Sequence, residues 1–525
     1  MSDQVIQQGG TVKHDHADEA RQAARGGLVS MVGAGTSAVM GFVLTLVLAR
    51  SFGTAGSGVV LQVIAVFSIA LGIARTGMDT AGIWILPRLA LSDVSKIRGA
   101  VMALLVPTAG VGIVMALLLV GVLPQLGLSG EGNEGEVLTA LSDVTWFLPF
   151  AAIMMVALAA TRGLGNVVPY TVVGAIALPM SRPVAVLLVV AVGGPAVWAA
   201  LAWAMPLPLA MIAALWALWM RLRRHEQRGG VKGSWLPDRG VFARIWKFAL
   251  PRWFSSGIEQ SIVWFDVILV GAIAGAGAAG VYGAASRFVS AGLIISTAMR
   301  MVISPRFSAL LSENKTRAVQ ELYSTTVTWI VLLGAPIYGL FMFFAPTALG
   351  WLGKGFQSGA LALIILCVGA ITSLLAGNVD SVLMMSGRSG WMAANKSVVL
   401  AINIAGNVVL VPVWGIVGAA ATWAFSLLLD AAMASIETRI FIGIRFDAKR
   451  VFYALFVAAV CVVPASVLAI VLLGNTTVSC LVAGVMTVVL LVLWCSIDRK
   501  RLRMNDLALL SRRGKTTTAN ATAVV

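Results

Sequence analysis

The sequence predicts an all-α polytopic membrane protein, on the evidence of its composition, its regularly spaced apolar stretches and an internal repeat. Of the 525 residues, 59% are hydrophobic and 11% are charged, whereas soluble domains average about 45–50% apolar and about 25% charged residues. So few charges cannot cover the surface of a soluble chain of this length. The composition therefore excludes large soluble catalytic domains, and the loops, at most about 30 residues long, are too short for an ordinary extramembrane domain.

Each predicted span is an apolar stretch long enough to cross a bilayer, for which a helix needs about 20 residues. About fourteen such stretches follow one another, separated by polar or charged segments. Because that number is even, both termini are expected on the same side of the membrane. The spans are predicted at 28–50, 58–87, 98–123, 144–163, 167–192, 195–220, 249–272, 279–304, 322–346, 359–385, 393–413, 415–437, 451–473 and 478–497.

The distribution of charge orients these spans. The formal net charge is +16, from 38 Lys and Arg against 22 Asp and Glu. Nearly all cations outside the spans fall on one side, and only Arg50 and Lys354 fall on the other. Basic loops stay in the cytoplasm, so the sequence predicts a protein of the cytoplasmic membrane with both termini cytoplasmic. The basic balance then reflects topology, and we expect no nucleic-acid partner.

An internal repeat divides the chain into two halves. Residues 53–59 (GTAGSGV) link the first two spans, and residues 275–281 (GAGAAGV) link the seventh and eighth at an offset of 222. Residues 199–204 (AALAWA) and 419–424 (AAATWA) match at an offset of 220. A nearly constant offset over several helices predicts two six-helix lobes, repeated in parallel. Transporters built in this way bind substrate between their halves and alternate access by rocking.

The predicted organisation consists of two lobes with flanking segments. These are a polar cytoplasmic tail at 1–27, an N-lobe at 28–220, a basic cytoplasmic linker at 221–248, a C-lobe at 249–445, two further helices at 446–497 and a basic cytoplasmic tail at 498–525. The four cysteines fall in apolar spans and are interpreted as small hydrophobic residues, not disulfides. We expect no metal site and no bound cofactor, and the lack of a GxxxxGK[ST] motif argues against ATP-driven transport.

Ionisable side chains inside the spans are the main functional candidates, because a charge at membrane depth is costly and normally faces a cavity or a partner. The cations are Arg75, Arg182, Arg252, Arg287, Arg300 and Lys396, and the acids are Asp79, Glu259, Asp266, Asp380 and Asp430. The cations outnumber the acids, and guanidinium groups bind phosphate oxygens bidentately. This excess favours a cavity for an anionic, oxygen-rich substrate, whereas an exporter of cationic drugs would more naturally have an acidic cavity.

Helical spacing groups several of these side chains. Arg252, Glu259 and Asp266 recur at intervals of seven residues, close to two helical turns, and are therefore expected on one face. Arg75 and Asp79 are four residues apart and can pair. That pair has two interpretations, a role in the cavity and a structural role in helix packing.

Depth in the membrane adds a second criterion. Arg252, Arg300 and Lys396 lie near the cytoplasmic ends of their spans, where snorkelling to the interface is an alternative explanation. Arg182 lies near mid-depth between Pro179 and Pro183. These prolines are expected to free backbone carbonyls and to break the helix, which is tolerated beside a wet cavity.

Two sets of candidate residues follow from these arguments. The substrate-binding set is Arg182, Arg287, Arg252, Arg75, Arg300, Lys396, Asn403 and Asn407. The set for a coupling H⁺ or Na⁺ is Glu259, Asp266, Asp79 and Asp380.

Several short motifs resemble those of polysaccharide flippases. They are, in chain order, Ala49-Arg50-x-Phe52-Gly53 with Gly58, Asp266, the turn at 275–280, residues 281–287 (VYGAASR), Ser304-Pro305, Gly387-Arg388, Asn395, Asn403, Asn407 and residues 415–420 (GIVGAA). In order and spacing, the chain from about 25 to 445 resembles the Wzx-type branch of the MOP superfamily of multidrug, oligosaccharidyl-lipid and polysaccharide exporters.

The resemblance implies two six-helix lobes around a central V-shaped cavity. It implies movement of an undecaprenyl-diphosphate-linked, or similar lipid-linked, oligosaccharide from the cytoplasmic to the outer leaflet by alternating access, with H⁺ or Na⁺ as coupling ion. Cationic cavity residues would meet the diphosphate and sugar acids. The chain would then be a transporter for cell-envelope polysaccharide synthesis and not an enzyme, with membrane lipids, a polysaccharide polymerase and glycosyltransferases as candidate partners.

Four alternatives stay open at this point. A lipid II flippase of the same superfamily also uses fourteen helices and a cationic cavity. A MATE-like multidrug exporter shares the fold but usually needs twelve helices and an acidic or apolar site. A membrane polymerase or glycosyltransferase would need catalytic carboxylates in an outer loop, and the acidic outer loop near 124–143 is short. A scaffold of an envelope complex would use the basic linker and tail for docking.

Overall fold

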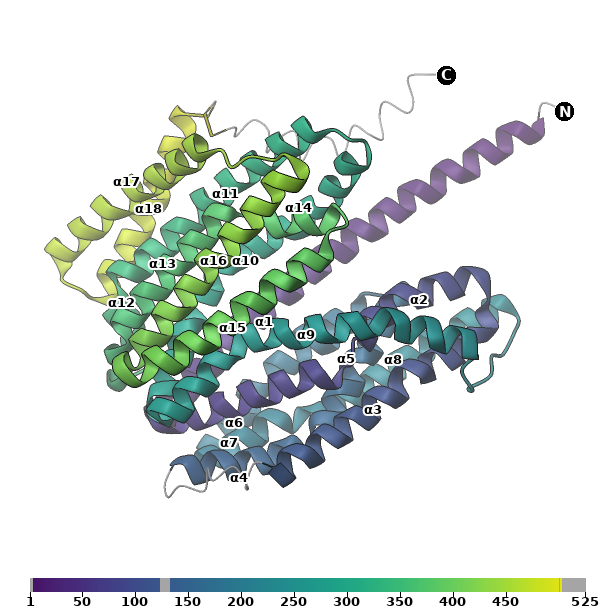
Figure 1. The fold of residues 1–525 in the computed structure, drawn as a ribbon, viewed down its shortest axis with the longest axis horizontal. Helices are drawn as coiled ribbons and strands as arrows, with labels where there is room; N and C mark the ends of the chain where they lie inside the picture. Colours follow the sequence, from purple (N-terminus) through teal and green to yellow (C-terminus); the bar gives the residue numbers. More distant parts are fainter. Residues whose placement is uncertain (1–2, 123–132, 500, 503–525) are drawn as a thin grey trace.

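The computed structural model describes residues 3–122, 133–499 and 501–502, and within these ranges it is helical and contains no strand. Figure 1 shows two bundles of helices lying side by side, the first from purple to blue and the second from green to yellow. Of the predicted segments, 503–525 and the first part of the acidic outer loop lie outside the described residues. The predicted all-α fold class is confirmed.

The first bundle contains the helices up to α8. Their bounds are α1 (Asp3–Ala74), α2 (Met78–Ser92), the 3-10 helix η1 (Val94–Lys96), α3 (Ile97–Val122), α4 (Asn133–Thr145), α5 (Leu148–Gly163), the π-helix η3 (Tyr170–Ala177), α6 (Leu178–Ala191), α7 (Ala196–Ala204) and α8 (Pro206–Gly229). The helix α4 corrects the sequence prediction, because most of its residues belong to the segment near 124–143 that was predicted as a loop.

The second bundle contains the remaining helices. They are α9 (Arg239–Ala274), α10 (Ala276–Ser312), α11 (Thr316–Phe343), α12 (Ala345–Gly350), the 3-10 helix η4 (Lys354–Gly359), α13 (Ala360–Ala376), α14 (Val379–Met385), α15 (Ser389–Trp414), α16 (Ile416–Ile442), α17 (Ala448–Leu473) and α18 (Thr477–Ile497). Each predicted span from the seventh onward coincides with one or two of these helices.

Eleven helices among the described residues are long and apolar enough to cross a membrane, or twelve if the bent pair α4 and α5 is one span. Two details account for the difference between twelve and the predicted fourteen. The first two predicted spans share one continuous element that is kinked at Gly53, where φ is 65°, and α10 is not among the eleven. The chain is a multi-pass membrane protein, and the number fourteen stays a prediction.

The helix irregularities do not lie at the prolines where the sequence predicts them. Both Pro179 and Pro183 lie within α6, which continues through them. The irregular segment is instead η3, directly before α6, whose π-helical hydrogen bonding is rare and is often found at functional sites. The second predicted span is broken at Arg75–Gly77, where Thr76 has a positive φ of 49°.

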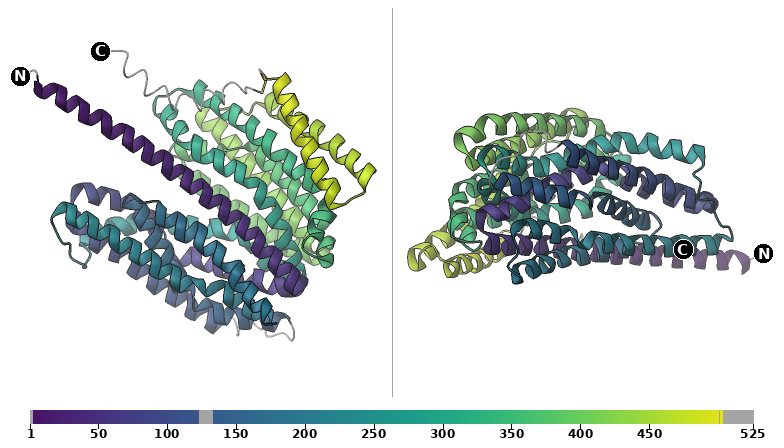
Figure 2. Two further views of the ribbon diagram at one scale, coloured as in Figure 1. Left: turned by 180° about the vertical axis from the view of Figure 1, so that it is seen from behind. Right: turned by 90° about the horizontal axis from the view of Figure 1, so that it is seen from below.

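The loops gather at two ends of the bundles (Figures 1 and 2). We call one end the basic face; it comprises the loops around 93–96, 229–239, 312–316 and 443–448. The opposite face comprises the loops around 192–195, 274–276, 343–360, 414–416 and 473–477. The start of α1 and the end of α18 both lie toward the basic face.

Two apolar cores hold the bundles together, and α1 and α9 contribute to both. In α9, Val241 and Ile245 belong to the core of the first bundle, whereas Val267 and Val270 belong to that of the second. In α1, Leu48 lies in the first core and its neighbour Ala49 lies in the second. These two helices therefore connect the bundles through buried side chains as well as through the chain itself.

The two repeated turns meet at the opposite face. A Cβ on Gly58 would clash with the backbone of Ala276 and Gly280, and a Cβ on Gly280 would clash with the carbonyl of Thr54. Gly58 and Gly280 are the residues that correspond at the repeat offset of 222. The contact is reciprocal, which places it on the axis that relates the two halves, and it is close because neither residue has a side chain.

The linker between the bundles is anchored at the basic face. The Arg98 guanidinium pairs with the buried Glu226 carboxylate at 2.5 Å and lies over the Trp235 ring. Asp238 then caps α9 by accepting hydrogen bonds from the backbone N–H groups of Val241 and Gly240, and these bonds hold the pKa of Asp238 below its usual value. The linker is thus fixed to the first bundle up to the start of α9.

Candidate functional site

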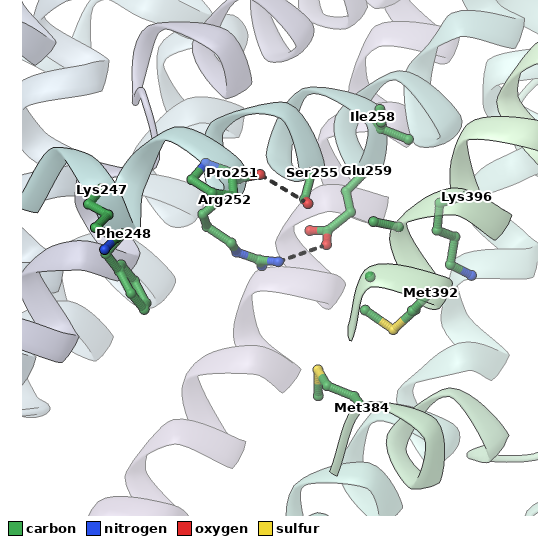
Figure 3. A pocket seen from close by; sticks show the side chains of 12 residues that line it. Lys247, Phe248, Pro251, Arg252, Ser255, Ile258, Glu259, Met384, Met392 and Lys396 are labelled. Atoms are coloured by element: carbon green, nitrogen blue, oxygen red, sulfur yellow. Dashed lines mark hydrogen bonds and ion pairs between the residues drawn. The ribbon is translucent and has the colours of Figure 1, made fainter. Parts of the chain in front are cut away.

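A cavity of about 470 Å³ lies between the basic-face half of α9 and the helices α14 and α15. In Figure 3, Arg252 and Glu259 project from α9 and the side chains of Met384 and Met392 extend toward them from α14 and α15, whereas the Lys396 ammonium group points away from Glu259. Because that half of α9 packs in the first core, whereas α14 and α15 belong to the second bundle, the cavity separates the two bundles. They touch at the opposite face and are apart near the basic face.

Arg252 and Glu259 form one side of the cavity. Their guanidinium and carboxylate groups are 3.3 Å apart, across two turns of α9. Both side chains remain partly exposed, at 37% and 44%, so they can reach a ligand without leaving a buried partner unpaired. The predicted stacking of these two residues is present.

Lys396 forms the other side and belongs to an ionic network. Its Nζ donates to Asp380 Oδ2 at 3.2 Å and to Asp430 Oδ2. Arg300, Asp380 and Asp430 line a smaller cavity of about 140 Å³. The alternative that Lys396 only snorkels to the interface is therefore wrong, since its ammonium group is bound inside the second bundle.

Asp266 points away from the main cavity into a fully buried polar cluster. It is 3% exposed and accepts hydrogen bonds from Tyr282 Oη at 3.1 Å and from Asn407 Nδ2 at 2.8 Å. Asn407 also contacts the carbonyl and side-chain oxygens of Asn403. The cluster joins α9, α10 and α15, and within the described residues Asp266 forms no ion pair. The seven-residue spacing predicts that Asp266 lies on one face with Arg252 and Glu259. The structure differs, because Asp266 does not share the cavity with them.

Arg182 and Arg287 are held by aromatic rings instead of carboxylates. The Arg182 guanidinium lies 4.0 Å from the centre of the Trp203 ring, and that of Arg287 lies 4.5 Å from the Trp264 ring. Neither forms an ion pair with a described residue, and the Nε of Arg182 is buried without a hydrogen-bond partner in the described structure. A cation–π contact positions a guanidinium but leaves its N–H donors available.

The pair formed by Arg75 and Asp79 lies where α1 ends and α2 begins. Its N–O distance is 3.1 Å and both side chains are mostly buried. Beside it, the Trp253 indole N–H donates to the Ile73 carbonyl at 2.7 Å, a bond between α1 and α9. The pair is present as predicted, at a break where the two helices of the first bundle meet α9.

The structure thus divides the predicted residues into four groups. The first group lines the main cavity and consists of Arg252, Glu259 and Lys396. The second is the ionic network of Lys396 with Asp380 and Asp430, and the third is the buried cluster of Asp266 with Asn403 and Asn407. The fourth group lies apart from these and consists of Arg182, Arg287 and Arg75. Sequence reasoning missed Trp203, Trp264 and Tyr282 as partners, because an aromatic residue in an apolar span gives no periodic signal. Within the described residues, no group of three or more His, Cys, Asp or Glu side chains could hold a metal ion.

Comparison with known proteins agrees with this architecture. Residues 23–311 match a family model described as polysaccharide biosynthesis protein. Over 215 residues the chain is 25% identical to the probable low-salt glycan biosynthesis flippase Agl15 of Haloferax volcanii. That alignment covers 41% of this chain and 44% of the relative, so less than half of the relative's length is matched.

Solved structures show a similar fold. A lipid II flippase MurJ in an inward closed conformation matches with a TM-score of 0.70, at 11% identity over 90% of this chain and 99% of that chain. A multidrug resistance MATE family transporter of the MOP superfamily, in an inward-facing conformation, matches with a TM-score of 0.63, at 13% identity over 78% and 94%. The family model matches more than half of this chain, and the chain therefore belongs to the polysaccharide biosynthesis protein family of the MOP superfamily.

Proposed function

We propose that this protein is a flippase that moves an undecaprenyl-diphosphate-linked, or similar lipid-linked, oligosaccharide across the membrane for polysaccharide synthesis. The observation that carries the proposal is the cavity between the bundles, with Arg252, Glu259 and Lys396 on its two sides. A cavity bounded by both bundles changes shape when they rock, which alternating access requires. Membership of the polysaccharide biosynthesis family and the similarity to a glycan biosynthesis flippase support the substrate class.

In this proposal the cations of the cavity bind the diphosphate. Arg252 and Glu259 are joined by a contact of 3.3 Å and remain 37% and 44% exposed, so the other N–H donors of Arg252 can bind a diphosphate while this pair stays intact. Lys396 is paired with Asp380 and Asp430, so a role of Lys396 in diphosphate binding requires that one of these carboxylates be released. Arg182 and Arg287 keep free donors above Trp203 and Trp264, and they would meet the anionic head as it passes. Arg75 and Arg300 remain candidates for the same role.

We further propose that Asp266 binds the coupling ion. Its carboxylate has hydrogen-bond donors but no ion pair in the described structure, so either H⁺ or Na⁺ can neutralise it, and the oxygens of Asn403 could complete a Na⁺ site. Glu259, Asp79 and Asp380 each have a cationic partner. A coupling role for them would require that this partner be displaced, which makes Asp266 the first candidate.

The proposed setting is the cytoplasmic membrane, with the basic face in the cytoplasm. The concentration of Lys and Arg in the loops of the basic face supports this orientation. The substrate would then enter the cavity from the leaflet in which its glycan is assembled. A polymerase and glycosyltransferases are the proposed functional partners.

The experiment that tests the proposal measures on which leaflet the lipid-linked oligosaccharide resides in cells depleted of the protein. An outer-leaflet-specific lectin or enzyme reads the outer pool. We expect the lipid-linked unit to be made in normal amounts and to accumulate on the cytoplasmic side. Normal sidedness with a missing or shortened polymer would instead indicate a polymerase or a scaffold. Normal polymer would favour a drug exporter, and accumulation of lipid II alone would identify a lipid II flippase.

A further inference from the structure

A second large cavity lies on the flank of the second bundle, away from the interface between bundles. It is a groove of about 650 Å³ between α11 and α18. Its sides include Leu332, Leu333 and Leu340 on α11 and Val488 and Leu491 on α18. In Figures 1 and 2, α17 and α18 lie at the edge of the molecule farthest from the first bundle. The groove is therefore separate from the cavity proposed for the transported substrate.

The groove has the length of one membrane leaflet. Its lining on α18 extends from Gly484 to Ser496, which at about 1.5 Å per residue corresponds to roughly 18 Å. Half of a hydrocarbon core of about 30 Å is roughly 15 Å. Gly484 lacks a side chain where α18 approaches Leu340. The groove thus runs from about mid-membrane to the basic face, beside a helix of which little is buried.

The end of the groove at the basic face is cationic. Arg499 lines it there, is exposed, and forms no ion pair with a described residue. The neighbouring Asp498 is occupied by the Tyr453 hydroxyl, which donates to it. The Trp329 indole N–H donates to the carbonyl of the buried Leu502 at 3.1 Å. The chain after α18 therefore folds back over this end of the groove and holds the Arg499 guanidinium beside the mouth.

We propose that this groove binds an anionic phospholipid of the leaflet at the basic face, with an acyl chain along α11 and α18 and its phosphate at Arg499. An apolar groove of one leaflet's length that ends at Arg499, which forms no ion pair with a described residue, is complementary to that amphiphile. A basic group near the membrane surface attracts anionic lipids, and guanidinium binds phosphate oxygens bidentately. The bound lipid would fill the space that α18 leaves against α11, and the proposal does not depend on which substrate the protein transports.

The first experiment tests the head group by native mass spectrometry of the full-length protein. Phosphatidylglycerol and phosphatidylethanolamine with identical acyl chains are titrated against the delipidated protein, and the wild type is expected to prefer phosphatidylglycerol. Arg499→Gln should weaken phosphatidylglycerol binding about fivefold, the loss that corresponds to about 1 kcal/mol per surface Arg. Lys449→Gln is the matched control, because Lys449 is exposed at the basic-face end of α17 and does not line the groove. Equal effects of the two variants, or none, would overturn the proposal.

The second experiment tests the apolar part. Val488→Trp should fill the groove and reduce the binding of both lipids. Val485→Trp should leave it unchanged, because Val485 is similarly exposed on α18 (66% against 60%) but does not line the groove. Both residues face lipid, so neither substitution disturbs the core. If Val488→Trp binds both lipids like the wild type, the groove is not the site.

Competition identifies the occupant. Inorganic phosphate and glycerol phosphate at millimolar concentration should not displace the lipid, because they lack the acyl chain; displacement by either would overturn the proposal. Displacement by stoichiometric polyprenyl phosphate would assign the groove to the transported lipid, and a dimer formed on delipidation would assign it to a second copy of the chain. Transport by Arg499→Gln and Val488→Trp is expected to remain near normal, so this proposal and the proposed function can fail independently.

Discussion

At the scale of single residues, the contact of an intramembrane arginine determines what it can do. Arg252 and Arg75 have carboxylate partners, whereas Arg182 and Arg287 lie over tryptophan rings. A desolvated cation–π contact contributes about 2 kcal/mol or more and leaves the N–H donors unsatisfied. Such an arginine is held in position but retains most of its capacity to bind an anion.

Arg182→Ala and Arg287→Ala are each expected to reduce transport about tenfold or more, the loss that corresponds to a hydrogen bond to a charged group. The sidedness of lipid-linked oligosaccharide measures transport, and the amount and thermal stability of the purified protein measure folding. Arg244→Ala serves as control, because Arg244 is exposed at the basic-face end of α9. A proportional loss of folded protein would instead show that the two arginines only support helix packing.

Asp266→Asn is expected to abolish the dependence of transport on the ion gradient while the protein stays folded. The amide keeps the size of the carboxylate and an oxygen that can accept from Tyr282, but it can neither carry charge nor bind a proton. Transport measured in proteoliposomes with imposed Na⁺ and pH gradients provides the test. Tyr282→Phe removes one hydrogen bond to this carboxylate and should reduce transport about tenfold without removing its dependence on the gradient. Gradient-dependent transport in Asp266→Asn would contradict the role of Asp266.

At the scale of elements, the two glycine turns form the contact that closes the opposite face. Gly58 and Gly280 allow α1 and α10 to touch through their backbones, with Gly280 against the Thr54 carbonyl. In the proposed alternating-access cycle, this contact must separate when the bundles rock to expose the cavity to the other side. Helix interfaces of small residues in membranes depend on such close packing.

Gly280→Ala is expected to hold the turns apart and to favour the state that is open at the opposite face. A cysteine that replaces Met392 in the cavity should then react several-fold faster with a membrane-impermeant thiol reagent added on that side. Gly277→Ala is the matched control, since its Cβ would lie 3.8 Å from Thr54 Oγ1, an ordinary contact. Unchanged reactivity in Gly280→Ala would show that the turns do not control access.

At the scale of the whole molecule, the proposed transport by alternating access requires that the two bundles move relative to each other. The Cβ position of Gly277 lies 3.8 Å from Thr54 Oγ1, so cysteines at these two positions would lie side by side. In a background without the native cysteines, Thr54→Cys with Gly277→Cys should cross-link on oxidation and stop transport, and a reductant should restore it. The single variants control for the substitutions. Full transport in the cross-linked protein would exclude rocking at this contact.

The sequence predicted the architecture well because apolar length and repeat offset are local properties of the chain. It also predicted that Arg252 and Glu259 lie on one face of a helix, because their spacing along the helix is a local property too. It failed for Asp266, because a helix drifts by about 20° over each seven residues and because the two ends of α9 pack in different cores. The partners of Lys396 and Arg287 come from other helices, and no spacing within one helix can indicate them.

The sharing of α1 between two cores also affects how the protein is made. Ala49, Leu61 and Ala65 of α1 form a surface that packs in the second core, yet the partner helix α10 begins 222 residues after the corresponding turn. At about 5–20 residues per second, synthesis of that stretch takes roughly 10–45 s. During this time the nascent first bundle exposes the face in the membrane, so an insertion chaperone or lipid must cover it until α10 arrives.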